Sequence, residues 1–125
     1  MSIAENVARI QEEMAKAAIA AGIQTILETT DTKESDITDF YICGGFGTHL
    51  NLDSAVTIGL IPEKLAKKAK VLGNGALSGA VKLMLDVTSH DRAATLAAAA
   101  KQMNLGGNPQ FNENYIDQMF FPERD

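Results

Sequence analysis

The chain has 125 residues, of which 46% are hydrophobic and 22% charged, proportions that are ordinary for a globular protein and argue against a disordered or fibrous one. Eleven Lys and Arg stand against sixteen Asp and Glu, and this net charge of −5 argues against a nucleic-acid partner. No apolar run approaches the roughly 20 residues that cross a bilayer, and no signal-peptide pattern opens the chain, so we expect one cytoplasmic domain over residues 1–125 with no membrane partner.

The first segment, residues 3–28, predicts a long helix. From Ile3 onward, apolar residues recur every three or four positions, which places them on one helical face. Ser2 followed three residues later by Glu5 is a capping-box pattern, which satisfies two backbone amides of the first turn. The apolar face widens around Gly22, so we expect the second half of this helix to be more deeply buried than the first.

Residues 40–43 are apolar and favour a buried strand, which a glycine loop of Gly44, Gly45, Phe46 and Gly47 ends abruptly. Ligands of open α/β sheets bind at this carboxyl edge of the strands. Glycines let the main chain approach a ligand closely, and their amides can face phosphate oxygens or the edge of a nucleoside. The spacing excludes the dinucleotide fingerprint and the P-loop. A tight turn that holds no ligand accounts for the pattern equally well.

The rest of the chain repeats this order of a strand, a glycine turn and a helix. Helices are expected over residues 52–58, 76–87, 90–102 and 109–120, and short strands over residues 71–72 and 103–105. Asn51 is the expected cap of the first of these helices. Asn108 and Pro109 are the expected cap and first residue of the last. Short strands among five helices predict the α/β class with an undersized sheet.

A second glycine turn, Gly73-Asn74-Gly75, leads into a helix with small residues on one surface. Such residues allow another backbone to come close, and this packing is more often structural than catalytic. We therefore interpret the helix that follows as a core element. Asn74, at the turn itself, is the better candidate for a polar contact with a ligand.

The remaining reactive side chains favour ordinary structural roles. Cys43, the single cysteine, can form no internal disulfide and cannot by itself hold an iron–sulfur cluster, so we interpret it as a small buried hydrophobe. His49 and His90 are interpreted as surface residues. Four lysines form a basic stretch that is interpreted as a solvated face: Lys64, Lys67, Lys68 and Lys70. We therefore predict no catalytic and no metal-ligating residue in the chain.

Three motifs in order resemble a single family: Cys-Gly-Gly-Phe-Gly at 43–47, Ile-Gly-Leu-Ile-Pro at 58–62 and Gly-Asn-Gly-Ala-Leu-Ser-Gly-Ala at 73–80. They are similar to the C-terminal region of the reductive activators of corrinoid proteins. Those activators are members of the actin, sugar-kinase and heat-shock-chaperone ATPase superfamily. The likeness covers nearly the whole chain. It implies half of an actin-like, ribonuclease H-like ATPase fold, in which about five helices flank a short sheet.

The resemblance also implies a nucleotide site. In that superfamily a strand followed by a glycine pair lies against the adenosine of ATP, which implies this role for residues 44–47. The helix before that strand supplies side chains around the adenine and ribose, for which Glu13 and Lys16 are the candidates. A Glu-x-x-Lys spacing is also the ordinary surface pairing of a solvated helix, and that interpretation stays open.

The implied reaction uses ATP hydrolysis to drive an electron from an iron–sulfur cluster to an inactive cobalt(II) corrinoid. This regenerates the cobalt(I) form that serves methyl transfer in one-carbon metabolism. The chain would supply only the adenosine side of the site, with ATP and Mg bound in the complete protein and no iron–sulfur cluster here. Its expected partners are the corrinoid protein and the remaining activator domains, a ferredoxin-like domain and the first ATPase lobe. We therefore expect a fragment of an ATPase that is inactive alone.

A second hypothesis is a protein-interaction module on the same scaffold that docks on a partner without turning over ATP. In either case a half-domain exposes apolar area. We therefore expect self-association, as in a homodimer, through residues 3–28 or the helical face at 75–80.

Overall fold

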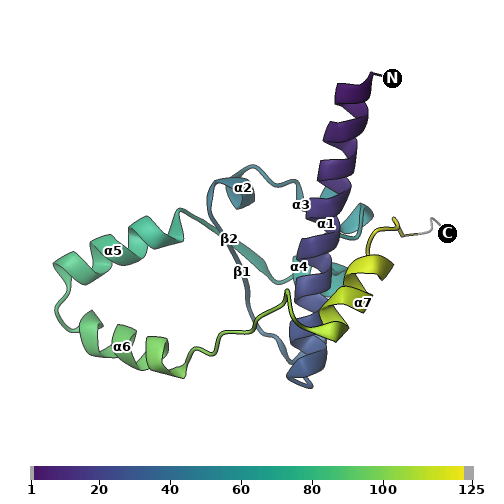
Figure 1. The fold of residues 1–125 in the computed structure, drawn as a ribbon. Coiled ribbons are helices and arrows are strands. Elements are labelled where there is room, and N and C mark those ends of the chain that lie inside the picture. The colour runs from purple at the N-terminus through teal and green to yellow at the C-terminus, as the bar shows by residue number, and fades with distance from the viewer. Residues whose placement is uncertain (1, 123–125) are drawn as a thin grey trace. The chain divides into compact units, whose positions relative to one another are not determined.

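Helices dominate the chain, and two short strands lie among them (Figure 1). The computed structural model describes residues 2–122. In chain order the elements are α1 (Ile3–Thr29), the 3-10 helix η1 (Glu34–Asp36), β1 (Phe40–Cys43), α2 (Gly45–Thr48), α3 (Leu52–Thr57), α4 (Glu63–Ala66), β2 (Ala69–Gly73), α5 (Gly75–Leu85), α6 (Ser89–Ala99) and α7 (Pro109–Asp117). Among the described helices, none combines the length and the hydropathy that a bilayer span requires. The predicted α/β class is confirmed.

The described residues divide into two compact units. The first unit comprises residues 2–40, 51–69 and 105–122, and it holds α1, η1, α3, α4 and α7. The second unit comprises residues 41–50 and 70–104, and it holds α2, α5, α6 and nearly all of both strands. The two glycine loops therefore belong to the second unit, and the long first helix belongs to the first.

Helix α1 begins at the capping box that the sequence predicts. The Ser2 hydroxyl accepts a hydrogen bond from the Glu5 amide at 3.2 Å, and the Glu5 carboxylate accepts one from the Ser2 amide at 2.8 Å. The predicted burial of the second half is also confirmed, because Ala17, Ala20 and Ala21 are buried while the first three turns are largely exposed. The small side chains of this buried stretch let neighbouring backbones approach α1 closely.

Helix α7 packs along α1 in the first unit (Figure 1). A buried polar contact lies between them, where the Asn114 amide donates to the Thr25 hydroxyl at 3.0 Å. The buried apolar residues of the first unit are Ala17, Ala20, Ala21, Ala55, Leu60, Ile61 and Leu65. Leu65 is the largest fully buried apolar side chain among the described residues, and its burial is worth about 2 kcal/mol relative to exposure. This core packs α1 together with α3, α4 and the segment between them.

In the second unit, β1 and β2 pair in parallel as a two-stranded sheet. The predicted strand at residues 103–105 is wrong, because this segment has no strand pairing. The apolar side chains of a three-residue run can be covered by packing in a coil as well as by pairing in a sheet. The Leu105 side chain lies 3.6 Å from the point where a Cβ on Gly22 of α1 would stand.

The prediction that α5 is a core element is also wrong. No residue of α5 or of α6 is buried, and Leu77 and Leu85 of α5 are 60% and 81% exposed. Small residues on one helical surface predict close packing, but a Cβ on Gly79 would meet no atom within 4 Å. Helix α5 is therefore a surface element of the second unit.

Candidate functional site

Two strand–glycine–helix junctions meet at the carboxyl ends of β1 and β2. Gly44 follows β1 with φ 94° and precedes α2, and Gly73 ends β2 with φ 65° and precedes the cap of α5. Residues with a side chain rarely adopt such positive φ angles, so the backbone favours glycine at both turns. The Gly44 amide donates to the Gly73 carbonyl at 2.6 Å. The fold therefore brings the two predicted glycine loops together.

The glycines of the first loop have different surroundings. A Cβ on Gly44 or Gly45 would meet no atom within 4 Å, and Gly45 does not require a positive φ. By contrast, a Cβ on Gly47 would collide with the Ile42 side chain. Gly47 is therefore required by packing inside the unit, whereas the main chain at Gly44 and Gly45 faces open space that a ligand can occupy.

The second loop has one packed and one capping residue. A Cβ on Gly75 would lie 3.1 Å from the Cys43 sulfur, so this glycine allows the start of α5 to approach the end of β1. The Asn74 side chain caps α5, because its oxygen accepts a hydrogen bond from the Leu77 amide at 3.0 Å. The amide nitrogen of this exposed side chain is the part of Asn74 that can contact a ligand, and that contact stays a prediction.

The other loop residues are placed as follows. Phe46 lies in α2, and its side chain falls outside the described part of the structure. His49 is exposed just after α2, and His90 is exposed at the start of α6, as predicted. Cys43 is exposed, so the interpretation as a buried hydrophobe is wrong: it ends a strand that pairs on one side only among the described residues.

The other two predicted contacts, Glu13 and Lys16, lie in the first unit on α1. Lys16 is only 6% exposed, and its Nζ donates to the Gln118 carbonyl at 2.8 Å and the Phe120 carbonyl at 3.1 Å. The same Nζ lies 5.7 Å from the centre of the Phe121 ring, a cation–π distance. Burial lowers the pKa of Lys16 from its ordinary value. Lys16 therefore fastens the segment after α7 onto α1.

Glu13 does not pair with Lys16. Its carboxylate lies 3.8 Å from Nε of Arg9, one turn earlier on α1. Glu13 and Lys16 nevertheless line one surface pocket of about 250 Å³, whose described lining is Arg9, Glu12, Glu13, Lys16, Ile58 and Phe121. The two side chains thus line the same pocket without forming an ion pair with each other.

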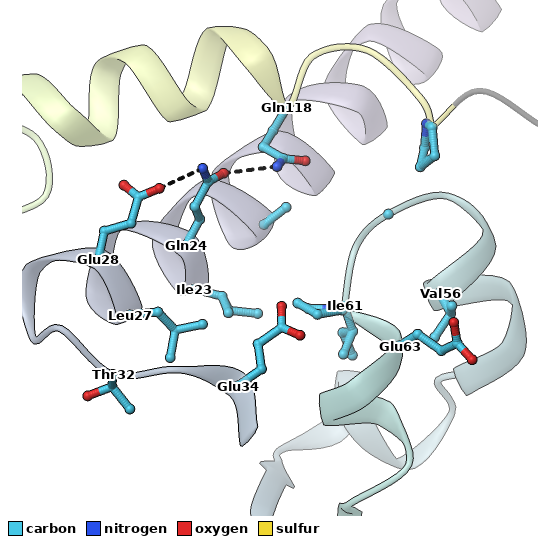
Figure 2. Close-up of a pocket in the computed structure, with 14 residues that line it drawn as sticks. Ile23, Gln24, Leu27, Glu28, Thr32, Glu34, Val56, Ile61, Glu63 and Gln118 are labelled. Atoms are coloured by element: carbon cyan, nitrogen blue, oxygen red, sulfur yellow. Dashed lines mark hydrogen bonds between the residues drawn. The ribbon is translucent and has the colours of Figure 1, made fainter. Parts of the chain in front are cut away.

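The first unit also holds a larger cavity of about 650 Å³ between α1, η1 and the α3–α4 segment (Figure 2). Figure 2 shows a hydrogen-bonded row on its α1 side, in which Gln118 donates to Gln24 at 3.1 Å and Gln24 donates to Glu28 at 2.8 Å. Glu28, Glu34 and Glu63 are among its lining residues, and no Lys or Arg is among those that the structure describes. This charge pattern does not suit a phosphate. Sequence patterns do not reveal this cavity, because its acidic residues come from three separate segments.

No group of three or more His, Cys, Asp or Glu residues is placed to hold a metal ion within residues 2–122. In the basic stretch at residues 64–70, Lys64, Lys67 and Lys70 are exposed, as predicted, whereas Lys68 is half-buried. Lys67 pairs with Glu63 at 2.9 Å, and the Lys68 Nζ donates to the carbonyls of Glu34 and Ile37. Lys68 therefore serves the packing of the first unit, whereas the Lys67–Glu63 pair lies on the surface.

Comparison with known proteins gives concordant results. The sequence model of a family described as the C-terminal domain of RACo, the ASKHA domain, matches residues 4–125. The corrinoid activation enzyme RamQ of Eubacterium limosum is 29% identical over 109 residues, which make up 87% of this chain and 18% of that protein. A solved reductive activator for corrinoid, iron–sulfur protein matches 93% of this chain with a TM-score of 0.82 and 33% identity, and the match covers 18% of that activator. The chain thus spans 18% of the length of these relatives.

Proposed function

The chain belongs to the family of RACo C-terminal ASKHA domains, and from this membership we propose that it forms the adenosine side of the ATP site of a corrinoid-protein activator. In the complete activator, ATP hydrolysis supplies the energy for transferring an electron to a cobalt(II) corrinoid, which restores cobalt(I). The corrinoid protein and the remaining activator domains are the proposed partners.

The observation that carries this proposal is the meeting of the two glycine junctions at the carboxyl ends of β1 and β2. Bound ligands of open α/β sheets lie beyond these strand ends. A Cβ placed on Gly44 or Gly45 would have no protein atom within 4 Å, so the main chain there is open to the close approach of a ligand. The likeness to corrinoid activators supports the same role for this loop.

The chemistry of the loop favours a nucleoside over a phosphate chain. Residues 41–50 contain no Asp, Glu, Lys or Arg, so the loop offers backbone amides and carbonyls without a charge to neutralise a triphosphate. Asn74 adds one uncharged side chain beside it. The triphosphate and its Mg are therefore proposed to be held by the remaining activator domains, and this chain orients the adenosine.

Glu13 and Lys16 are the proposed contacts to adenine and ribose from α1. Their support is that both line the pocket of about 250 Å³. The Lys16 amine already donates to the carbonyls of Gln118 and Phe120, so a bound nucleoside would have to compete with these bonds.

The test is the variant Gly45→Val, studied by backbone-amide NMR during titration with ATP. In the wild-type chain, ATP is expected to shift the amide signals of residues 44–47, even where binding by this domain alone is weak. The β-branched side chain fills the open space over the loop, so these shifts should be lost, while the fold is kept because no protein atom lies within 4 Å of the new Cβ.

Two comparisons sharpen this test. Ala97→Val, on the exposed part of α6, introduces the same side chain away from the loop and should leave the ATP shifts unchanged. Adenosine should reproduce the ATP shifts, and inorganic triphosphate should not. Equal ATP affinity in folded Gly45→Val and wild-type protein would show that the loop is only a turn.

A further inference from the structure

Helices α5 and α6 form a helical hairpin in the second unit (Figure 1). The turn at residues 86–88 joins them. A pocket of about 340 Å³ lies between the two helices, and its described lining is Gly79, Lys82, Leu83, Ser89, Arg92, Ala93 and Leu96. Neither the glycine loops nor the nucleotide proposal uses any of these residues.

The turn is held by Asp86, whose carboxylate is directed at the start of α6. One of its oxygens accepts from the Thr88 amide at 3.0 Å and also from the Thr88 hydroxyl, and the other accepts from the Ser89 hydroxyl at 2.8 Å. These bonds, Thr88 first, hold the pKa of Asp86 below its usual range, with a smaller contribution from the charge of Lys82. Asp86 is thus engaged in the turn and does not neutralise the pocket by a direct ion pair.

The two charged residues of the pocket are both cations. Lys82 comes from α5 and Arg92 from α6, and within residues 2–122 neither forms an ion pair. No carboxylate belongs to the described lining; the nearest in sequence are Asp86, in the turn, and Asp91, which is exposed on the first turn of α6. The second unit has four Lys and Arg and two Asp, in a chain whose net charge is −5. The pocket is therefore positive in an acidic protein.

Between the cations, the pocket is apolar. Leu83 and Leu96 line it from the two helices and are 36% and 63% exposed, so they offer hydrocarbon that remains in contact with solvent. A small anion would use the two cations and leave this hydrocarbon uncovered. An occupant with both an acidic and an apolar side chain would use all of it.

We propose that the α5–α6 pocket binds an acidic segment of a partner protein, with a carboxylate between Lys82 and Arg92 and an apolar side chain on Leu83 and Leu96. Permanent interfaces resemble protein cores and are depleted in charge, whereas the rims of separable interfaces are polar. Two cations beside a small apolar patch fit a separable interface. Opposite charges also speed the encounter with an acidic partner.

The probe for this proposal is a synthetic amphipathic helical peptide that carries Glu and Leu on one face, with its binding to the whole chain followed by fluorescence anisotropy. Arg92→Gln should weaken binding about fivefold, and the Lys82→Gln/Arg92→Gln pair about tenfold or more. Lys101→Gln is the matched control, because it removes one positive charge from the second unit outside the pocket. Its affinity should stay within about twofold of wild type. Leu96→Gln should weaken binding while leaving the charges in place.

The outcomes separate this proposal from its alternatives. Binding that weakens when the peptide's Glu residues are replaced by Gln, and that weakens with added salt, supports a paired carboxylate. Equal losses in Arg92→Gln and Lys101→Gln would show unspecific charge attraction and overturn it. Binding of inorganic phosphate without binding of the peptide would also overturn the proposal. None of these readouts involves ATP, so failure here leaves the nucleotide proposal unaffected.

Discussion

At the scale of single residues, Lys16 has a structural role that its sequence position does not reveal. The sequence allows two interpretations of Lys16, a nucleotide contact or a surface pairing with Glu13. In the structure Glu13 pairs with Arg9, and Lys16 bonds to carbonyls 102 and 104 residues away. A pattern of neighbouring residues cannot reveal partners so far away in the sequence. The nucleotide role of Lys16 stays a prediction, but its role in the packing of the first unit is observed.

Lys16→Met tests this packing role. Met keeps most of the buried hydrocarbon but cannot donate, so the carbonyls of Gln118 and Phe120 lose their bonds to Nζ. We expect a loss of about 1–2 kcal/mol in the free energy of unfolding, measured by urea denaturation, and faster amide exchange after α7. Lys64→Met, at an exposed site of the same unit, should change stability by less than about 0.5 kcal/mol. Equal stability of the two variants would contradict the anchoring role.

The glycines show a second limit of sequence reasoning at this scale. The pattern predicts a strand-to-helix turn at residues 44–47, and the structure has it. The pattern cannot separate Gly47, which packs against Ile42, from Gly45, which faces open space. That distinction depends on which neighbouring side chain points at each Cα, and only the folded backbone determines this.

At the scale of elements, long periodic segments with caps can be predicted well and short ones poorly. Helix α1 and helix α7 begin at the predicted caps, Ser2 and Asn108. The one-turn helices α2 and α4 escape prediction, because four residues carry no helical periodicity. The predicted strand at 103–105 is absent from the described sheet, since a three-residue apolar run is equally compatible with packing as a coil.

The contact between α1 and α7 predicts a dependence of stability on pH. Hydrogen bonds from Asn114 and then Gln24 hold the pKa of Glu28 below its ordinary value. A carboxylate with a lowered pKa in the folded state contributes stability above its unfolded pKa, and this contribution is lost as the pH falls through the folded pKa. The free energy of unfolding should therefore decrease as the pH falls below about 5, through the ordinary carboxyl pKa and further down.

Glu28→Gln isolates this contribution. Gln does not ionise, so this variant should lose less of its free energy of unfolding on acidification than wild type. The measurement is urea denaturation repeated at each pH of the series. Glu12→Gln, an exposed change on the same helix, should keep the wild-type slope. A pH profile of Glu28→Gln that runs parallel to wild type would show that the bonds to Asn114 and Gln24 do not stabilise the ionised form.

At the scale of the whole molecule, the predicted family is confirmed, because the family model covers residues 4–125. The motifs at 43–47, 58–62 and 73–80 are sufficient for this, since each contains glycine or proline at positions where the backbone conformation leaves little choice. The expectation of one domain over residues 1–125 stays a prediction, and within it the described residues form two compact units. Pattern reasoning cannot see this division, because each unit is assembled from segments that are separated along the chain.

We predict that the chain alone hydrolyses no measurable ATP. Phosphoryl transfer depends on metal ions and charges positioned around the γ-phosphate. The described residues contain no cluster suited to a metal ion, and the glycine loops carry no charge. Release of inorganic phosphate from Mg-ATP should therefore equal that of a protein-free sample. Robust Mg-dependent turnover that is lost in Gly45→Val would contradict the assignment of this chain to only one side of the site.

The exposed thiol of Cys43 gives the molecule a natural attachment point for a spectroscopic probe. It is the single cysteine of the chain, it directly precedes Gly44, and its sulfur lies beside Gly75 at the start of α5. A maleimide dye or nitroxide would therefore label one atom where the two glycine loops meet, without any engineered substitution. Its emission or line shape would report events at the loops directly, in this chain by itself and in the presence of a proposed partner domain.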